Sequence, residues 1–222
     1  MSRPWNLIEA SATDDGGRLE LFSRTPEWSI CIRGKELMNS RAHASEDGMA
    51  RLAVARLAAA SERHVLVGGL GMGFTLRAAL GVLGPTDRVT VAELLPAIVA
   101  WNRGPLADLA GRPLEDPRTT LRVEDVGRVM RDGIGAFDAI LLDVDNGPDG
   151  LVVPSNDLLY GPAGLATARR ALRPGGVLAV WSAHPSDPFT RRLNRAGFRA
   201  EVRTMRGAPG NKGPTHTVWF AT

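Results

Sequence analysis

Glycines alternate at positions 69, 71 and 73, between a short apolar run and a helical pattern, in the segment Gly68-Gly-Leu-Gly-Met-Gly73. The apolar run at residues 64–67 predicts a buried strand, and a helix is predicted from there through about residue 83. Gly68, Gly69, Gly71 and Gly73 let the backbone turn sharply beneath a ligand, with the N-terminus of the helix beyond it. The segment therefore predicts the strand–turn–helix unit from which parallel α/β sheets are built.

Strand and helix patterns continue to alternate to the end of the chain. Further strands are predicted at residues 88–92, 119–124, 139–142, 176–181, 199–205 and 215–220, and helices at residues 45–60, 96–103, 126–132, 164–172 and 188–196. Ser45 is a candidate N-cap for the first helix. This order predicts an α/β fold with a doubly wound, mostly parallel seven-stranded sheet of the Rossmann-like type. A loop without a helix joins the last two strands, so we expect them to be antiparallel.

The first 44 residues have a different pattern, with short runs of alternating apolar and polar residues at 18–22 and 28–32. They predict a small antiparallel β-hairpin unit. Such a unit is too small to fold alone, so we expect it to pack on the larger domain or on a second subunit, as in a homodimer. The chain is thus divided into an N-terminal β unit, 1–44, and a Rossmann-like domain, 45–222.

Charge and cysteine content narrow the classes of function. The pI of about 9.7 is high because arginine, which does not titrate in a useful range, supplies nearly all of the positive charge. A net charge of +3 spread along the chain is weak support for nucleic-acid binding. The single cysteine, Cys31, excludes an intrachain disulfide and a multi-cysteine zinc site, which fits a reduced, cytoplasmic setting. Without a long apolar run, we expect neither a signal peptide nor a membrane span.

Acidic residues follow the predicted strands at the edge where ligands bind in such sheets. Glu93 lies twenty residues after Gly73, at the end of the second strand, where a carboxylate can accept both ribose hydroxyl hydrogens. Asp125 follows the third strand and could accept from an adenine amino group. No Gly-Lys-Ser/Thr follows the turn, so a P-loop is excluded. Carboxylates suit a cationic ligand, which favours S-adenosylmethionine over NAD; the alternative is a structural turn with surface carboxylates.

An acidic loop, Asp143-Val-Asp-Asn-Gly-Pro-Asp-Gly150, follows the fourth strand. Asp143 stands at the carboxyl end of that strand, at the edge where ligands bind in open α/β sheets. The alternative interpretation is a solvated turn, because Asp, Asn, Gly and Pro are turn formers. A calcium loop is excluded, because Gly147 and Pro154 stand where acidic ligands are needed.

Several of these segments resemble one family. They are Leu66-Val-Gly-Gly-Leu-Gly-Met-Gly-Phe-Thr-Leu-Arg77, Val89-Thr-Val-Ala-Glu93, Asp116-Pro-Arg118 and Leu172-Arg-Pro-Gly-Gly-Val-Leu178. Together they are similar to class I S-adenosylmethionine-dependent transferases with the methyltransferase fold. More narrowly they resemble spermidine synthase, the polyamine aminopropyltransferase family, which also has a small N-terminal β unit.

The resemblance implies a role for each matching residue. The glycine turn and Glu93 would bind the nucleoside, Asp125 would lie near the adenine, and Asp143 would be the proton acceptor. The implied co-substrate is S-adenosylmethionine or its decarboxylated form, without a metal, and the acceptor is a small-molecule amine.

This sequence also departs from the family pattern. The family's aspartate inside the glycine turn falls on Gly71, and the second aspartate of its Asp-x-x-Asp motif falls on Asn146, beside Asp145. Arg41-Ala-His-Ala-Ser-Glu46 loosely replaces the family's Tyr-His/Gln-Glu segment. Glu46, Asp145 and Asn146 are therefore the candidate substrate-binding residues. A methyltransferase acting on a small molecule and a non-catalytic nucleoside-binding relative remain alternative hypotheses.

Other residues carry weaker signals. His184 follows the fifth strand near the expected cleft, whereas His216 is predicted to lie within the last strand. Trp101 could flank an adenine, although core packing is the more common role of a tryptophan. The arginine-rich segment 191–206 is interpreted as a solvated face, with an RNA contact as the alternative.

Overall fold

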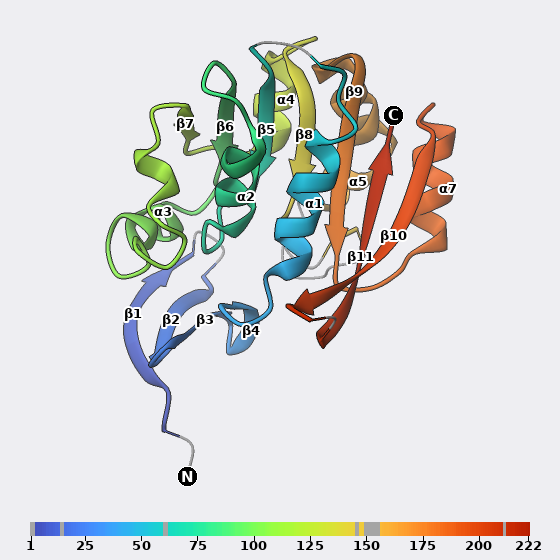
Figure 1. Cartoon of the computed structure of the whole chain (residues 1–222). Helices are drawn as coiled ribbons and strands as arrows, with labels where there is room; N and C mark the ends of the chain where they lie inside the picture. The colour runs from blue at the N-terminus through green and yellow to red at the C-terminus, as the bar shows by residue number, and fades with distance from the viewer. Residues whose placement is uncertain (1–2, 14–15, 60–61, 145–146, 149–155, 211) are drawn as a thin grey trace.

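A seven-stranded sheet with helices on both faces makes up the larger part of the molecule, and a smaller sheet lies below it in Figure 1. This computed structural model describes residues 3–13, 16–59, 62–144, 147–148, 156–210 and 212–222. The strands of the larger sheet are β5 (His64–Gly68), β6 (Arg88–Ala92), β7 (Thr119–Arg122), β8 (Phe137–Leu142), β9 (Leu172–Ser182), β10 (Ala200–Ala208) and β11 (Lys212–Ala221).

The larger sheet has the strand order β10-β11-β9-β8-β5-β6-β7. The strands from β5 to β9 run parallel, and β11 pairs antiparallel with both β9 and β10. The predicted fold and the antiparallel pair at its end are therefore confirmed. From β5 the chain proceeds outward through β6 and β7, and from β8 it proceeds to the other side of the sheet through β9. The order therefore reverses between the neighbours β5 and β8, and the crevice at their carboxyl ends is where ligands bind in open α/β sheets.

Helices cover both faces of this sheet. One layer contains α1 (Ala44–Val54), α2 (Phe74–Val82) and α3 (Pro96–Arg103); the other contains α4 (Val126–Asp132), α5 (Asn156–Tyr160), α6 (Pro162–Ala171) and α7 (Asp187–Arg195). Figure 1 shows α1 and α2 in front of the sheet. Within β5, Val65 and Val67 pack toward the first layer and Leu66 toward the second, and all three are buried. Burial on both faces explains the unbroken apolar run in the sequence.

The first helix differs from its prediction. It starts at Ala44 and ends at Val54, well before the expected end at residue 60, and His43 occupies the N-cap position. Ser45 is the second residue of α1, and its hydroxyl hydrogen-bonds the side chains of Trp181 and His216. The N-cap prediction for Ser45 was therefore wrong, because long-range partners occupy its hydroxyl. The short helices α5 and η1 (Pro113–Glu115) were not predicted.

The N-terminal unit is larger than the predicted hairpin. It is a four-stranded antiparallel sheet in the order β1-β2-β3-β4, formed by β1 (Asn6–Ala12), β2 (Arg18–Arg24), β3 (Glu27–Ile32) and β4 (Lys35–Asn39). The hairpin that the sequence predicted is the central pair, β2 and β3. Leu19 and Leu21 of β2 and Ile30 and Ile32 of β3 belong to the same buried cluster as α1 and α2, so the unit packs on the larger domain as expected.

The exposure of the two outer strands of the small sheet explains why the sequence pattern did not predict them. Most residues of β1 are exposed, and those of β4 are exposed or half-buried, so neither strand has a clear alternation of apolar and polar residues. Among the described residues, no helix is both long and apolar enough to cross a membrane.

Candidate functional site

The glycine turn links the carboxyl end of β5 to α2. Gly69, Gly71 and Gly73 have φ values of 89°, 52° and 83°, in the left-handed region that favours glycine. A Cβ on Gly69 would lie 2.3 Å from the carbonyl oxygen of Asp143, and one on Gly68 would lie 2.9 Å from Val126. The turn is therefore pressed against the backbone that follows β8, and it ends with Gly73 at the N-cap of α2.

Glu93 is held against this turn. It follows β6, is 8% exposed, and accepts hydrogen bonds from the backbone N–H of Leu70 and of Leu95, at 2.8 Å each. Burial raises the pKa of the Glu93 carboxyl, and the backbone N–H groups around it oppose that rise. The carboxyl group thus stands directly beside the glycine turn, which is the location that a ribose-binding acid requires; the role itself stays a prediction.

Asp125 has a structural role that the sequence reasoning did not foresee. Its side chain is the N-cap of α4 and accepts a hydrogen bond of 2.9 Å from the backbone N–H of Arg128. The residue is exposed at the carboxyl end of β7. This cap accounts for an aspartate at the position without any ligand, and the adenine contact remains a prediction.

Asp143 stands at the carboxyl end of β8, next to the glycine turn. Its backbone N–H donates to the carbonyl oxygen of Gly68 at 2.9 Å. Thr75, in the first turn of α2, donates its hydroxyl to the Asp143 carboxylate at 2.5 Å. Burial raises the pKa of Asp143 to about 6, and the hydrogen bond from Thr75 opposes this rise. No sequence signal marked Thr75, whose position becomes clear only once α2 is packed against β8.

Glu46 approaches Asp143 from α1. It is 6% exposed, and burial, reinforced by the nearby negative charge of Asp143, raises its pKa to about 8. Asp143 therefore ionises at a lower pH than Glu46 does. The structure thus brings these two predicted residues close enough for the charge of Asp143 to raise the pKa of Glu46, and their catalytic roles stay predictions.

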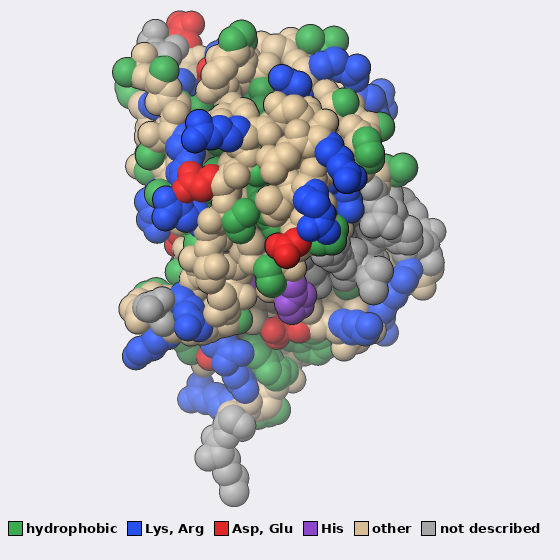
Figure 2. All heavy atoms as spheres, turned by 90° about the vertical axis from the view of Figure 1, so that its right-hand side faces the viewer, with side chains coloured by type: hydrophobic (Ala, Val, Ile, Leu, Met, Phe, Trp, Pro, Cys, Tyr) green, Lys and Arg blue, Asp and Glu red, His purple; other side chains and the backbone are tan. Residues whose placement is uncertain are grey.

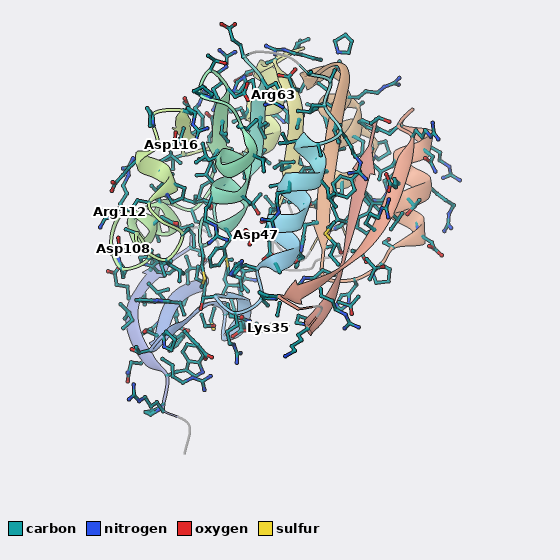
Figure 3. All side chains as sticks on the ribbon, in the orientation of Figure 1. Lys35, Asp47, Arg63, Asp108, Arg112 and Asp116 are labelled. Atoms are coloured by element: carbon teal, nitrogen blue, oxygen red, sulfur yellow. The ribbon has the colours of Figure 1, made fainter. Side chains whose placement is uncertain are left out.

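Asp47, the next residue of α1, has a different environment. It accepts hydrogen bonds from Arg77 of α2 at 2.7 Å and contacts Nδ1 of His43 at 3.0 Å. Burial would raise the pKa of Asp47, but these two partners outweigh that effect and hold it below the ordinary value. Figure 3 shows Asp47 on the side of α1 that faces α2. Its charge is therefore neutralised locally, whereas no arginine or lysine hydrogen-bonds to Glu46 or Asp143 among the described residues.

The N-terminal sheet also reaches the glycine turn. A Cβ on Gly71 would lie 2.8 Å from Sδ of Met38, which belongs to β4. On the other side, the Asn102 amide of α3 donates to the carbonyl oxygen of Gly71 at 2.8 Å. The space beside Gly71, where the resembling family has an aspartate, is thus occupied by a methionine side chain. Met38 was not identified from the sequence.

The remaining candidates lie in several places. Asp145 and Asn146 fall outside the described residues. His184 is exposed just beyond β9, and His216 is buried within β11, as expected. Trp101 is 1% exposed and donates its Nε1–H to Glu9 at 2.8 Å, which supports the core interpretation.

A cavity of about 550 Å³ lies away from these carboxyl groups, between α2 and residues 110–118. Figure 3 shows Arg112 and Asp116, two of its lining residues, at the far side of α2 from α1. Its charged residues are already paired, Arg112 with Glu115 and Arg118 with Asp116. It therefore lacks the convergent, unpaired polar groups of a ligand site.

Sequence comparison points to one group of enzymes. No family model matches the chain. A polyamine aminopropyltransferase of Mycobacterium tuberculosis is 32% identical over 157 residues, which are 69% of this chain and 28% of that protein. One of Korarchaeum cryptofilum is 28% identical over 137 residues, which are 61% of this chain and 40% of that protein. The chain thus spans less than half the length of these curated relatives.

Solved structures agree with the sequence comparison. The spermidine synthase of Thermotoga maritima has a TM-score of 0.76 at 17% identity, and the match covers 97% of this chain and 71% of that one. A spermidine synthase in complex with the transition state analogue AdoDATO has a TM-score of 0.75, also at 17% identity and with the same coverage. The chain therefore resembles polyamine aminopropyltransferases in sequence and shares the fold of spermidine synthases, which confirms the resemblance identified from the motifs.

Proposed function

We propose that this protein is a transferase that moves an aminopropyl group from decarboxylated S-adenosylmethionine to a small amine. The observation that carries the proposal is a half-buried carboxyl group, Asp143, next to a buried one, Glu46, beside a glycine turn in a chain that is similar to aminopropyltransferases. Asp143, which ionises at the lower pH of the two, gives the crevice a local negative charge, although the whole chain is basic, and a cationic amine is attracted to such a charge.

The nucleoside part of the co-substrate would bind at the carboxyl ends of β5, β6 and β7. The turn formed by Gly68, Gly69, Gly71 and Gly73 would lie beneath it, and Glu93 would accept the ribose hydroxyls. The buried position of Glu93 against the turn supports this arrangement. Asp125 would approach the adenine while still capping α4.

Asp143 would prepare the acceptor for attack. A primary amine with a pKa near 10 arrives as an ammonium ion and must lose one proton before its nitrogen lone pair can attack. The nitrogen then forms a bond to the propyl carbon, the carbon–sulfur bond breaks with its electron pair going to sulfur, and a neutral thioether leaves. The product is a secondary ammonium ion, so each turnover releases one proton. Glu46 would orient the ammonium group, and Asp145 and Asn146 remain further candidates for substrate binding.

The contact between Gly71 and Met38 favours a second candidate function. The protein would then be a methyltransferase that acts on a small molecule. An aspartate at Gly71 would repel the carboxylate of intact S-adenosylmethionine, and its absence removes that repulsion. Met38 instead offers an apolar, polarizable surface at this position. Either donor therefore suits the nucleoside site, and the transferred group distinguishes the two functions.

Calorimetry with decarboxylated S-adenosylmethionine, S-adenosylmethionine and methylthioadenosine tests nucleoside binding, and mass spectrometry of reactions with diamines tests transfer. We expect methylthioadenosine and the decarboxylated donor to bind, and a diamine to gain one aminopropyl group. Glu93→Gln should weaken binding about 10-fold or more, as expected for a lost charge-assisted hydrogen bond, while the exposed Glu62→Gln serves as its control. Failure of all three nucleosides to bind would refute the proposal.

The outcomes also separate the alternatives. Stronger binding of S-adenosylhomocysteine than of methylthioadenosine would select the methyltransferase. Binding without turnover, in a protein whose Asp143→Asn variant behaves like the wild type, would select a non-catalytic relative.

We further propose that the small sheet forms a homodimer contact. Within the described part of the chain, β1 is an edge strand that pairs only with β2, and it exposes Leu7 and Ile8, at 47% and 43%. Edge strands with exposed apolar side chains are suited to pairing with a second chain. Light scattering that finds a monomer at micromolar concentration would refute this.

The remaining proposals concern setting and partners. A cytoplasmic location, the absence of a resident metal, a boundary between residues 44 and 45 and the absence of a nucleic-acid partner all stay predictions. Figure 2 shows Lys and Arg side chains in separate groups over one face, with acidic side chains among them. In the arginine-rich segment, Arg192 donates to the Tyr160 carbonyl and Arg203 pairs with Glu201. This distribution supports a solvated face over a continuous RNA-binding surface.

A further inference from the structure

Next to the Asp143–Glu46 pair lies a chain of buried polar groups that have no role in the proposed transfer step. Ser45, at the start of α1, is fully buried. Its hydroxyl oxygen lies 2.5 Å from Oε2 of Glu46 and 2.7 Å from Nδ1 of His216 on β11, and Nε1 of Trp181 on β9 donates to it at 3.0 Å. Three elements of the fold therefore converge on one hydroxyl group.

The numbers of donors and acceptors restrict how this group can be protonated. A hydroxyl has one hydrogen and two lone pairs, and the indole N–H of Trp181, which can only donate, occupies one lone pair. Of the other two partners, one must therefore donate to Ser45 and the other must accept from it. When Glu46 is ionised, Ser45 donates to Glu46 and Nδ1 of His216 carries a hydrogen. When Glu46 is protonated, it donates to Ser45, and Ser45 donates to a bare Nδ1.

We propose that Ser45 and His216 form a proton relay that connects the buried carboxyl group of Glu46 to the imidazole of His216. This inference rests on the proposed function, because that reaction releases one proton per turnover beside Asp143. The proton passes from the amine to the Asp143–Glu46 pair. The Glu46 proton then moves to the Ser45 oxygen as the Ser45 proton moves to Nδ1, and a proton leaves Nε2, so that Glu46 ends ionised and His216 changes from its Nε2–H tautomer to its Nδ1–H tautomer. No electron is gained or lost, and Ser45 ends with one hydrogen, as it began.

The surroundings of His216 suit this role. The residue is 7% exposed, and burial, together with the nearby His184, lowers the pKa of its imidazole, so that it is neutral near pH 7 and can alternate between tautomers. The ring of Trp181 packs against it in an edge-on contact at 4.7 Å between centroids. From β10, Gly207 approaches it closely, since a Cβ there would lie 2.8 Å from Cε1 of His216. The ring is thereby held in place.

Few charged groups act on the relay among the described residues. Glu46 is affected by Asp143 and by Asp47, and the charge of Asp47 is neutralised by Arg77. The pKa of His216 is affected by His184, which is exposed beyond β9. The residue that pairs with His216 on β10 is the uncharged Met205. The protonation of Glu46 and the tautomer of His216 are therefore linked mainly through Ser45.

NMR of the histidine ring nitrogens tests this link without any ligand. In the wild type, we expect the Nδ1 and Nε2 shifts of His216 to exchange between the two tautomer patterns over the pH range in which Glu46 titrates. Glu46→Gln should abolish this pH-dependent exchange. In Ser45→Ala, the tautomer of His216 should no longer follow the titration of Glu46. His64, a half-buried histidine whose Nε2 contacts Thr90 at 2.9 Å, supplies an internal reference. A His216 tautomer that is the same in wild type and Glu46→Gln at every pH overturns the relay.

Turnover, if the proposed function holds, gives a second test. Ser45→Ala should lower kcat about 10-fold or more, shift its pH profile and leave KM unchanged, whereas Ser45→Thr, which keeps the hydroxyl, should restore the rate. The matched control is Ser29→Ala, which removes a buried serine hydroxyl bonded to Glu36 in the small sheet, at 2.8 Å. Equal pH profiles for wild type and Ser45→Ala would overturn the relay. Loss of nucleoside binding would instead refute the proposed function, and the NMR result would still decide the relay.

Discussion

Replacing Glu46 by glutamine should stabilise the protein, and the gain should grow with pH. In the unfolded chain Glu46 ionises near its ordinary pKa of 4.5, whereas in the folded protein it ionises only near about 8. Above the lower value the unfolded state binds fewer protons than the folded state, so the free energy of unfolding falls as pH rises toward the higher value. A glutamine, which has the shape of the protonated acid, does not have this cost.

The magnitude follows from the size of the shift. A difference of about 3.5 pKa units corresponds to about 5 kcal/mol when both states are ionised, and about 4 kcal/mol of this develops between about pH 5 and about pH 9.

Urea unfolding, followed by tryptophan fluorescence across this pH range, measures the effect. We expect the free energy of unfolding of Glu46→Gln to exceed that of the wild type by an amount that increases steadily with pH. Glu62→Gln, at an exposed position, is the matched control. Parallel curves for Glu46→Gln and the wild type would show that Glu46 is not held protonated by burial and by Asp143.

Three further predictions concern the same region. Thr75→Val should raise the pKa of Asp143 above about 6 by roughly one unit, because the hydrogen bond that stabilises its ionised form is lost, and Thr75→Ser should not; carboxyl carbon NMR measures this. Gly69→Ala should destabilise the fold by roughly 2 kcal/mol or more in urea unfolding, because φ is positive and the new methyl group meets the carbonyl oxygen of Asp143; an unchanged midpoint would contradict the close approach. Gly71→Asp should lower the thermal midpoint when Met38 is present and lower it less in the Met38→Ala background, and equal losses in both would show that Met38 does not occupy that space.

The parts of the site that could be predicted are those set by local geometry. Glu93 was found because a strand, a turn and a helix of ordinary length place an acid at the end of the next strand beside the turn. Asp143 was found for the same reason, since carboxyl ends of parallel strands meet at one edge. Both inferences need only the order of elements along the chain.

Contacts between distant segments could not be predicted in this way. Ser45 and His216 are 171 residues apart, and nothing in either neighbourhood indicates that α1 will cross β11 at that position. The serine was interpreted as a helix cap because local capping is the commonest role of a serine before a helix. Met38 was missed for a related reason, since the half-exposed strand β4 has no clear apolar pattern.

The close contact between Gly69 and the carbonyl oxygen of Asp143 has a further consequence for how the site could change. The glycine turn and Asp143 are joined backbone to backbone, through this contact and the hydrogen bond from the Asp143 N–H to Gly68, so a shift of one would move the other. Met38 of β4, in contrast, meets Gly71 only through its side chain, which can be exchanged without altering this backbone contact. The glycine turn is therefore fixed on the Asp143 side by main-chain geometry, whereas on the β4 side its neighbour is an exchangeable side chain. A change of ligand preference would therefore be sought by varying β4, with the glycine turn and the Ser45–Glu46 pair of α1 left intact.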